Sequence, residues 1–157
     1  MILSSLPKII RFRGRYFFLS NMYPCKVKLN SVTFPSAEHA FQAAKCVNRE
    51  DVEKILRCKT GKEAKRVGRK VKLREDWERI KDEVMYRVVK AKFNQNKDLA
   101  KKLIDTYPAI LVEGNTWRDT YWGVDLFHKS KRYLYGYRGR NKLGEILMEV
   151  RDELRKL

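Results

Sequence analysis

The sequence predicts a single α+β domain, mostly α-helical with a small β-sheet, and three observations lead to this prediction. The chain has 157 residues, 43% of them hydrophobic, which suits one domain with one core. About five or six segments carry helical patterns, against about three or four short strand patterns. No internal repeat, linker or low-complexity tract interrupts the chain. We therefore expect residues 1–157 to form one domain.

The N-terminal third is expected to supply most of the sheet. Residues 9–18 are rich in Ile, Phe and Tyr, and we interpret them as one or two short strands with a turn. Residues 27–29 and 32–34 have the pattern of a small hairpin, with Asn30 in its turn. Residues 110–113 are the remaining candidate strand, and we expect them to join the same sheet.

The helices are predicted from periodicity and from their start signals. The clearest is residues 75–93, where apolar residues recur with a period of 3.6. Thr60 and Glu63 form a capping-box pattern, and Asn141 is a candidate N-cap for the last helix. The expected helices are residues 37–47, 51–57, 60–69, 75–93, 96–105 and 141–157, and residues 114–137 are expected to be loop.

The charge balance points to anionic partners. Lys and Arg number 36 against 19 acidic residues, for a net charge of +17. Such a field favours phosphates, nucleotides and nucleic acid. The alternative is ordinary surface charge, because Lys/Glu/Arg-rich surfaces also occur in heat-stable proteins.

Cysteine and histidine usage argues against a metal site. The three cysteines contain no CxxC pair and the chain has two histidines, so we expect free thiols, no metal and no cofactor. A catalytic cysteine near His39 is the minor alternative. The N-terminal apolar run is too short for a signal peptide and no stretch reaches the length of a membrane span, so we expect a soluble, cytoplasmic protein.

The most informative segment runs from Ser36 to Lys45. Ser36 is the expected N-cap of a helix on which Glu38, Gln42 and Lys45 share one face, at i, i+4 and i+7. A carboxylate, an amide and an amine on one stripe form either a solvated salt-bridge face or a site that protonates, orients and attacks.

Two later segments also carry candidate chemistry. Trp122 beside Gly123 is either a platform for a flat ring or a plug at the edge of the core. At the start of the last helix, free backbone N–H groups together with Arg140 and Lys142 would suit a phosphate, and plain capping by Asn141 is the alternative.

Four segments together resemble the NADAR family, also called YbiA-like. They are residues 18–21 (FLSN), 34–45 (FPSAEHAFQAAK), 119–123 (DTYWG) and 139–151 (GRNKLGEILMEVR). Each motif alone is weak, but their order and spacing are specific. Matching fragments between them extend the similarity over nearly the whole chain. The resemblance implies one NADAR (YbiA-like) domain over residues 1–157.

The resemblance implies an N-glycosidase that cleaves a bond between a ribose C1 and a nitrogen. The implied substrates are phosphorylated ribosylamino-pyrimidine intermediates of riboflavin synthesis and ADP-ribose attached to guanine. The implied catalytic residues are Glu38, Lys45 and Asp119, with either carboxylate as the main acid or base. The substrate-binding residues that we expect are Ser20, Asn21, Gln42, Trp122, Gly123, Arg140, Asn141 and Gly144. Among them, Trp122, Gly123, Asn141 and Gly144 match positions of the family motifs.

Residues 124–138 depart from the family pattern, because they are longer, more aromatic and more basic than its short Gly- and Asp-rich loop. Rings interleaved with cations are typical of single-strand or flipped-base recognition, whereas a plain covering loop is the alternative. We expect this segment to form one wall of the substrate pocket. The alternative function for the whole chain is a non-catalytic nucleotide- or nucleic-acid-binding module.

Overall fold

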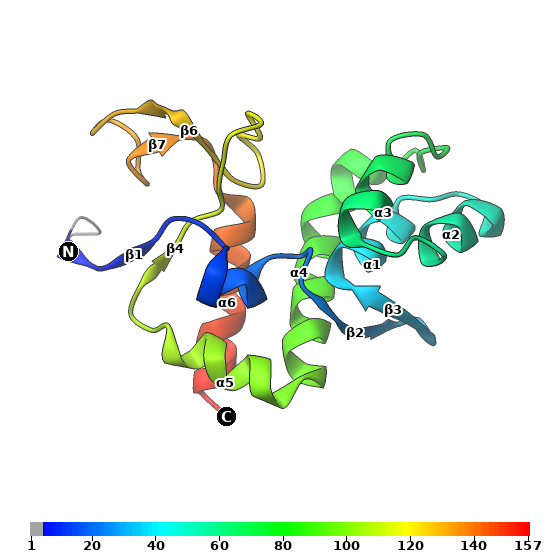
Figure 1. Cartoon of the computed structure of the whole chain (residues 1–157), viewed down its shortest axis with the longest axis horizontal. Coiled ribbons are helices and arrows are strands. Elements are labelled where there is room, and N and C mark those ends of the chain that lie inside the picture. The colour runs from blue at the N-terminus through cyan, green and yellow to red at the C-terminus, as the bar shows by residue number, and fades with distance from the viewer. Residues whose placement is uncertain (1–4) are drawn as a thin grey trace. The chain divides into compact units, whose positions relative to one another are not determined.

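The computed structural model describes residues 5–157, and its contacts divide the chain into two compact units. Unit 1 consists of Met1–Ser20 and Ala100–Leu157, and unit 2 is Asn21–Leu99. Both units contain helices and short strands, and helices hold more residues than strands do (Figure 1). The predicted mostly helical α+β fold class is confirmed, whereas the extent of a single domain over residues 1–157 stays a prediction.

Unit 2 begins with the predicted hairpin. Strands β2 (Pro24–Leu29) and β3 (Val32–Ser36) pair antiparallel, with Val27 opposite Phe34 and both side chains buried. Asn30 lies in the turn at φ 49° and Ser31 follows at φ 68°. Positive φ at both central residues is what a type I′ hairpin turn requires. The predicted position of Asn30 is therefore confirmed.

Helix α1 (Ala37–Ala44) starts at the predicted cap. The Ser36 hydroxyl accepts a hydrogen bond of 3.1 Å from the His39 backbone N–H, which fixes the helix start. The helix ends at Ala44, three residues earlier than predicted, because Cys46 pairs with Leu73 in an isolated antiparallel bridge. Helix α1 contacts both strands of the hairpin and three other helices (Figure 1). Most of its side chains are therefore buried.

Those three helices of unit 2 are α2 (Arg49–Leu56), α3 (Gly61–Gly68) and α4 (Trp77–Gln95). Thr60 caps α3 as predicted, since its hydroxyl accepts from the Glu63 N–H at 3.1 Å. The Glu63 carboxylate reaches the N–H of Lys59 instead of that of the cap residue. The buried stripe of α4 includes Lys92, 1% exposed, whose ammonium lies 5.0 Å from the Phe93 ring centre.

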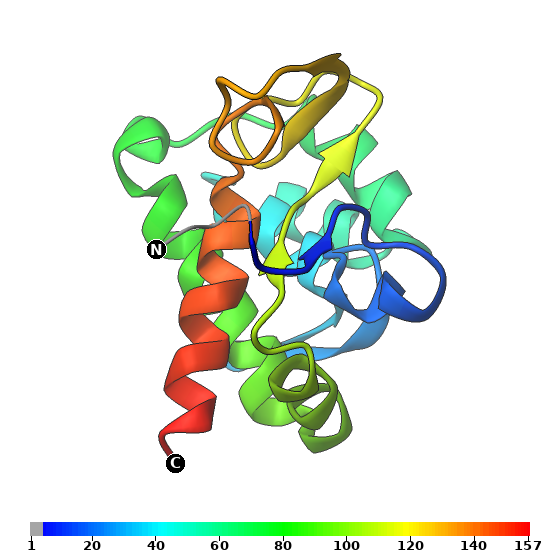
Figure 2. The same cartoon turned by 90° about the vertical axis from the view of Figure 1, so that its left-hand side faces the viewer.

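Unit 1 is built on helix α6 (Lys142–Arg155), which contacts strand β4 (Ile110–Leu111) (Figure 2). Strand β1 (Lys8–Ile9) pairs with β4 in parallel. Residues Gly14–Leu19 form a 3-10 helix rather than the expected second strand, since Phe18 and Leu19 bury on one turn. Helix α5 (Lys97–Asp105) contains the boundary between the units.

The prediction of one sheet, and of loop throughout residues 114–137, is wrong. Strands β5 (Gly114–Asn115), β6 (Val124–Lys129) and β7 (Tyr137–Arg138) form a further sheet, with β5 parallel and β7 antiparallel to β6. The described residues thus hold three small sheets. These strands show little alternation, because their pairing depends on partners distant in sequence. No helix within residues 5–157 has both the length and the apolar character to cross a membrane.

Candidate active site

The predicted stripe on α1 is a buried polar cluster. Glu38 is 7% exposed and Gln42 is 4% exposed. The Gln42 amide Nε2 donates a hydrogen bond of 2.6 Å to Oε2 of Glu38. A solvated salt-bridge face is therefore the wrong interpretation for these two side chains. A buried carboxylate held by an amide is costly to maintain and is suited to acid–base or charge-stabilising chemistry.

Helix α3 closes over this cluster through two glycines. A Cβ at Gly68 would overlap the Gln42 side-chain oxygen, and one at Gly61 would lie 3.2 Å from the Glu38 Cβ. Any larger residue at Gly68 would displace the Gln42 amide. Within residues 5–157, the buried Gln42 Oε1 has no hydrogen-bond partner. The amide is therefore oriented by Glu38 on one side and by the close approach of the α3 backbone on the other.

Lys45 stands at the end of the same stripe in a cationic surrounding. Burial lowers the pKa of the Lys45 amine, and the positive charges of Arg69 and Lys65 lower it further. The negative charge of Glu38 acts in the opposite direction. A lowered pKa leaves more of the amine neutral near pH 7, which is the form that attacks carbonyls and imines.

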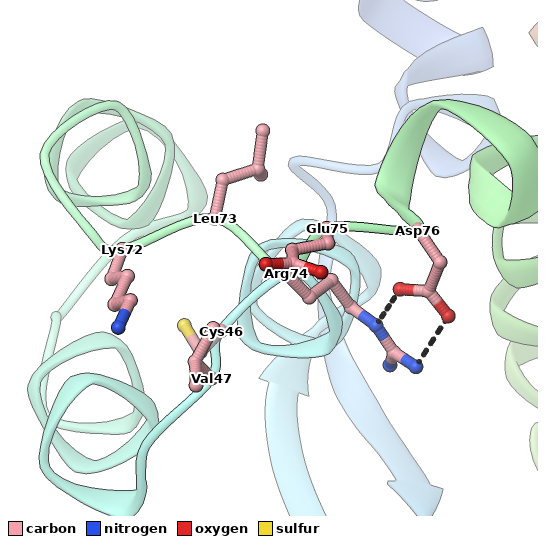
Figure 3. Close-up of a pocket in the computed structure, with 7 residues that line it drawn as sticks. All are labelled: Cys46, Val47, Lys72, Leu73, Arg74, Glu75 and Asp76. Carbon is pink, nitrogen blue, oxygen red and sulfur yellow. Dashed lines mark hydrogen bonds and ion pairs between the residues drawn. The ribbon is translucent and has the colours of Figure 1, made fainter.

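The backbone around Lys45 is held by the segment that precedes α4. The Arg74 N–H donates to the Lys45 carbonyl at 3.0 Å, and the Arg74 guanidinium donates to the Ala44 carbonyl at 3.4 Å. The same guanidinium forms a two-pronged ion pair with Asp76, at 2.6 and 3.1 Å (Figure 3). Asp76 therefore orients the arginine that closes the C-terminal end of α1.

An open hollow of about 630 Å³ lies beside this arginine (Figure 3). None of the predicted site residues lines it. Its lining includes Cys46, Val47 and Leu73 around the bridge that follows α1. The hollow is therefore next to the catalytic candidates along the chain but is not made by them.

The alternative of a catalytic cysteine near His39 finds no support in the structure. His39 is buried, its Nδ1 hydrogen-bonds the Ser36 hydroxyl at 2.6 Å, and its Nε2 bonds the Cys58 carbonyl at 2.9 Å. Burial raises the pKa of the Cys58 thiol, and it raises the pKa of Cys46 to about 11. Neither thiol is activated as a thiolate, and His39 is a structural residue.

In unit 1, Asp119 organises the loop that carries Trp122. Its Oδ1 accepts hydrogen bonds of 3.0 Å from the backbone N–H groups of Tyr121 and Trp122. Asn115 fixes Asp119 in turn, donating to its carbonyl at 2.8 Å. The rings of Tyr121 and Trp122 pack edge to face, with 4.8 Å between their centres. The Cζ atom of the exposed Arg140 guanidinium lies 5.0 Å from the centre of the Tyr121 ring. One oxygen of Asp119 is thus already used to shape the loop.

Asn141 is the N-cap residue of α6, as predicted, but its side chain makes no capping hydrogen bond. Asn141 is fully buried in a left-handed conformation, and its side chain bonds the Leu111 carbonyl and the Glu113 N–H, both at 2.9 Å. It therefore ties the start of α6 to the chain around β4.

The amides expected to be free for a phosphate are also in use. The Lys142 N–H donates to the Tyr121 carbonyl at 3.1 Å, and the Leu143 N–H donates to the Trp122 carbonyl at 3.0 Å. These bonds hold the Trp122 loop against the start of α6. Gly144 approaches the Leu111 carbonyl and Gly123 approaches the Glu113 carbonyl, both too closely to admit a Cβ.

The predicted catalytic residues are divided between the two units: Glu38 and Lys45 belong to unit 2, and Asp119 belongs to unit 1. Asn21 lies with Glu38 in unit 2, where its carbonyl accepts the Glu38 N–H at 2.9 Å. Ser20 is the last residue of the N-terminal part of unit 1, and Asp119 lies in the other part of that unit. That Glu38 and Asp119 act on one substrate stays a prediction. Among residues 5–157, no three His, Cys, Asp or Glu side chains are grouped to hold a metal ion.

Sequence reasoning assigned no role to Gly68, Arg69 or Arg74. A glycine and an arginine near the end of a short helix, such as Gly68 and Arg69, carry no chemical signal by themselves. Arg74 had one available signal, because an Arg-x-Asp spacing before a helix can form a local ion pair. Its contact with the end of α1 joins residues 30 positions apart and has no local signature.

Comparison with known proteins identifies the family. The NADAR domain model matches residues 11–155. The N-glycosidase YbiA of Escherichia coli (strain K12) is 38% identical over 141 residues, which cover 88% of this chain and 82% of that protein. An N-glycosidase of Nostoc punctiforme is 33% identical over 147 residues, covering 90% of this chain and 88% of that protein. The chain therefore belongs to the NADAR family of YbiA-like N-glycosidases.

A solved structure supports the same fold. The NMR structure of Escherichia coli YbiA aligns with a TM-score of 0.81 at 32% identity, covering 99% of this chain and 88% of that one. A riboflavin biosynthesis protein of Vibrio vulnificus is 38% identical over 141 residues, which are 88% of this chain and 36% of that protein. The chain thus corresponds to about a third of that longer relative.

Proposed function

We propose that this N-glycosidase hydrolyses the ribose C1–N bond of a phosphorylated ribosylamino-pyrimidine, an intermediate of riboflavin synthesis. One structural observation carries the chemistry: a buried carboxylate, Glu38, lies on the same helix stripe as Lys45, an amine whose pKa is lowered. The similarity to a riboflavin biosynthesis protein supports the choice of substrate class. ADP-ribose attached to guanine is the second substrate to test, because it contains the same kind of bond.

The proposed roles follow from the charge that develops at C1. Cleavage of a glycosidic bond passes through an oxocarbenium-like state, which a nearby carboxylate stabilises. Glu38 takes this role, and Gln42 keeps its carboxylate in one orientation through the 2.6 Å hydrogen bond.

Lys45 gives the reaction a covalent route. An exocyclic ribosylamine opens to an imine between C1 and the base nitrogen, and the neutral Lys45 amine adds to C1. The base nitrogen then leaves as a free amine, taking up a proton, and C1 remains bound to Lys45 as a Schiff base. Water hydrolyses this bond, which releases the sugar and restores the amine. The alternative route is direct attack of water at C1, with Glu38 as base.

The decisive experiment is an assay of both substrates for release of free base. Turnover of the ribosylamino-pyrimidine phosphate supports the proposal, and turnover of ADP-ribosyl-guanine alone transfers it to the second substrate. Borohydride added during turnover separates the two routes, because a reduced sugar adduct on Lys45 in the mass spectrum requires the Schiff base. Absence of turnover of either substrate would overturn the proposed function.

A further inference from the structure

The β6–β7 hairpin of unit 1, residues 124–138, is a cationic and aromatic surface that the proposed chemistry does not use. From Leu126 to Gly144 the chain contains no Asp or Glu. Four cations of the hairpin are exposed to solvent: Lys129, Lys131, Arg132 and Arg138. A continuous segment without any carboxylate attracts polyanions rather than forming internal ion pairs.

The hairpin is anchored in the core of unit 1 through Tyr135. Tyr135 is buried against Ile110, Val112 and Val124, and its hydroxyl donates to Oε2 of Glu145 at 2.8 Å. The turn is closed by the Ser130 N–H, which donates to the Gly136 carbonyl, and by the Gly136 N–H, which donates to the Tyr133 carbonyl. Tyr135 is one of the aromatic residues of segment 124–138, but its ring belongs to the core and is not available to stack on a ligand.

The base of the hairpin is fixed by a buried aspartate. Asp125 accepts the Phe127 N–H at 2.9 Å through Oδ1 and pairs with the His128 ring at 2.7 Å through Oδ2. These bonds, with the charges of His128 and Arg118, hold the pKa of Asp125 below its usual range. Asp125 is therefore held inside the base of the hairpin by the hairpin's own hydrogen-bond donors, and its carboxylate is not presented to solvent.

Large apolar side chains project from the same region into solvent. Phe127 is 71% exposed, Tyr133 is 38% exposed and Leu134 is 63% exposed. Trp117, 61% exposed, follows β5, the strand that pairs with β6. Along β6, Phe127 and Lys129 are two residues apart, so about 6–7 Å of strand separates their Cα atoms. This spacing is of the order that separates the base and the phosphate of one nucleotide.

We propose that the β6–β7 hairpin is a docking surface for single-stranded nucleic acid, with bases stacked on Phe127 and Tyr133 and phosphates on Lys129, Lys131 and Arg132. Charge complementarity supports this occupant, since residues 126–144 contain no acid and the whole chain carries +17. The exposed apolar groups are mostly flat rings separated by cations, which suits stacking on bases. An anionic membrane surface would favour a contiguous aliphatic tip, whereas Leu134 is the one aliphatic side chain among these exposed groups.

The test is fluorescence anisotropy with a labelled oligothymidylate of about twelve nucleotides, within the usual size of such sites. Replacing Phe127 and Tyr133 by Ala is expected to weaken binding by about fivefold or more for each ring. K131Q/R132Q is expected to reduce the magnitude of the salt-dependence slope by about 1.4, since each phosphate contact contributes about 0.7 on single strands. The matched control is K97Q/K101Q on α5, which removes the same charge from two other exposed positions.

Three outcomes decide the proposal. Losses confined to the hairpin variants, with unchanged melting temperatures, support it. Equal effects of the two charge pairs would overturn it, because the binding would then depend on net charge alone. Binding of phosphatidylserine vesicles that the hairpin variants lose, without loss of oligonucleotide binding, would also overturn it and identify a membrane surface. The result is independent of the glycosidase assay, so either proposal can fail alone.

Discussion

The Gln42 amide donates a hydrogen bond of 2.6 Å to the Glu38 carboxylate one helical turn earlier, and both side chains are buried. The Gly68 backbone lies against the other side of that amide. The Glu38 carboxylate is thus kept in one orientation inside unit 2. Its negative charge partly offsets the lowering of the Lys45 pKa by burial. The candidate catalytic residues can be tested one relationship at a time.

Glu38→Gln is expected to lower kcat more than about tenfold without a matching fall in melting temperature. The replacement removes the charge but keeps the size and the capacity to accept the Gln42 hydrogen bond. The measurement is steady-state kinetics together with thermal unfolding. Glu50→Gln, an exposed acid of α2, serves as the control and should leave both unchanged. Near-normal turnover by Glu38→Gln would remove Glu38 from the mechanism.

Arg69→Gln is expected to move the rising limb of the pH–rate profile to higher pH. The attacking amine must be neutral, so the rate rises as pH passes the pKa of Lys45. Burial and the charges of Arg69 and Lys65 lower this pKa, and loss of the Arg69 charge therefore raises it. Lys70→Gln, the adjacent exposed lysine, is the control and should leave the limb in place. Equal profiles for wild type and Arg69→Gln would argue against Lys45 as the titrating group.

The same pKa has a consequence for stability. The Lys45 pKa is lower in the folded state than in the unfolded state, so the folded protein binds fewer protons between these two values. Stability contributed by this group therefore rises with pH across that window. Lys45→Met should reduce the rise in the free energy of unfolding, measured by urea titration at several alkaline pH values. An unchanged slope in Lys45→Met would contradict the lowered pKa.

Gly68→Ala is expected to displace the Gln42 amide, lowering activity and destabilising the fold by about 1–3 kcal/mol through overpacking. Truncating Gln42, the side chain that the new Cβ would overlap, tests whether this overlap causes the loss of stability. The double variant Gln42→Ala/Gly68→Ala should be more stable than the two single effects predict, with a coupling of about 0.5–3 kcal/mol. Additive free energies of unfolding would show that the two residues are not in contact.

Arg74→Lys is expected to lower kcat by about tenfold with little change in KM. Lysine cannot form the two-pronged pair with Asp76, so the backbone of Ala44 and Lys45 loses its fixed position, and small misplacements of a reacting group are costly. Arg79→Lys, an exposed arginine near the same aspartate, is the control. A change in KM alone would assign Arg74 to substrate binding instead.

Local patterns in the sequence were sufficient for much of the fold. Ser36 and Thr60 mark helix starts because each hydroxyl accepts a hydrogen bond from the backbone N–H three residues later. This bond is local and does not depend on the tertiary structure. Asn30 marks a turn because it tolerates positive φ. The stripe of Glu38, Gln42 and Lys45 follows from helical spacing alone, and the order of the family motifs identifies the family.

Tertiary structure alone decided which of these residues are buried, paired or already in use. Asn141 is of a residue type that caps helices, but its side chain hydrogen-bonds the backbone of Leu111 and Glu113 instead. Tyr135 is of a residue type that stacks on bases, but its ring lies in the core. The short strands of residues 114–137 exist only through pairing with distant partners. Burial, pairing and pKa depend on contacts between segments far apart in the chain, which no local periodicity encodes.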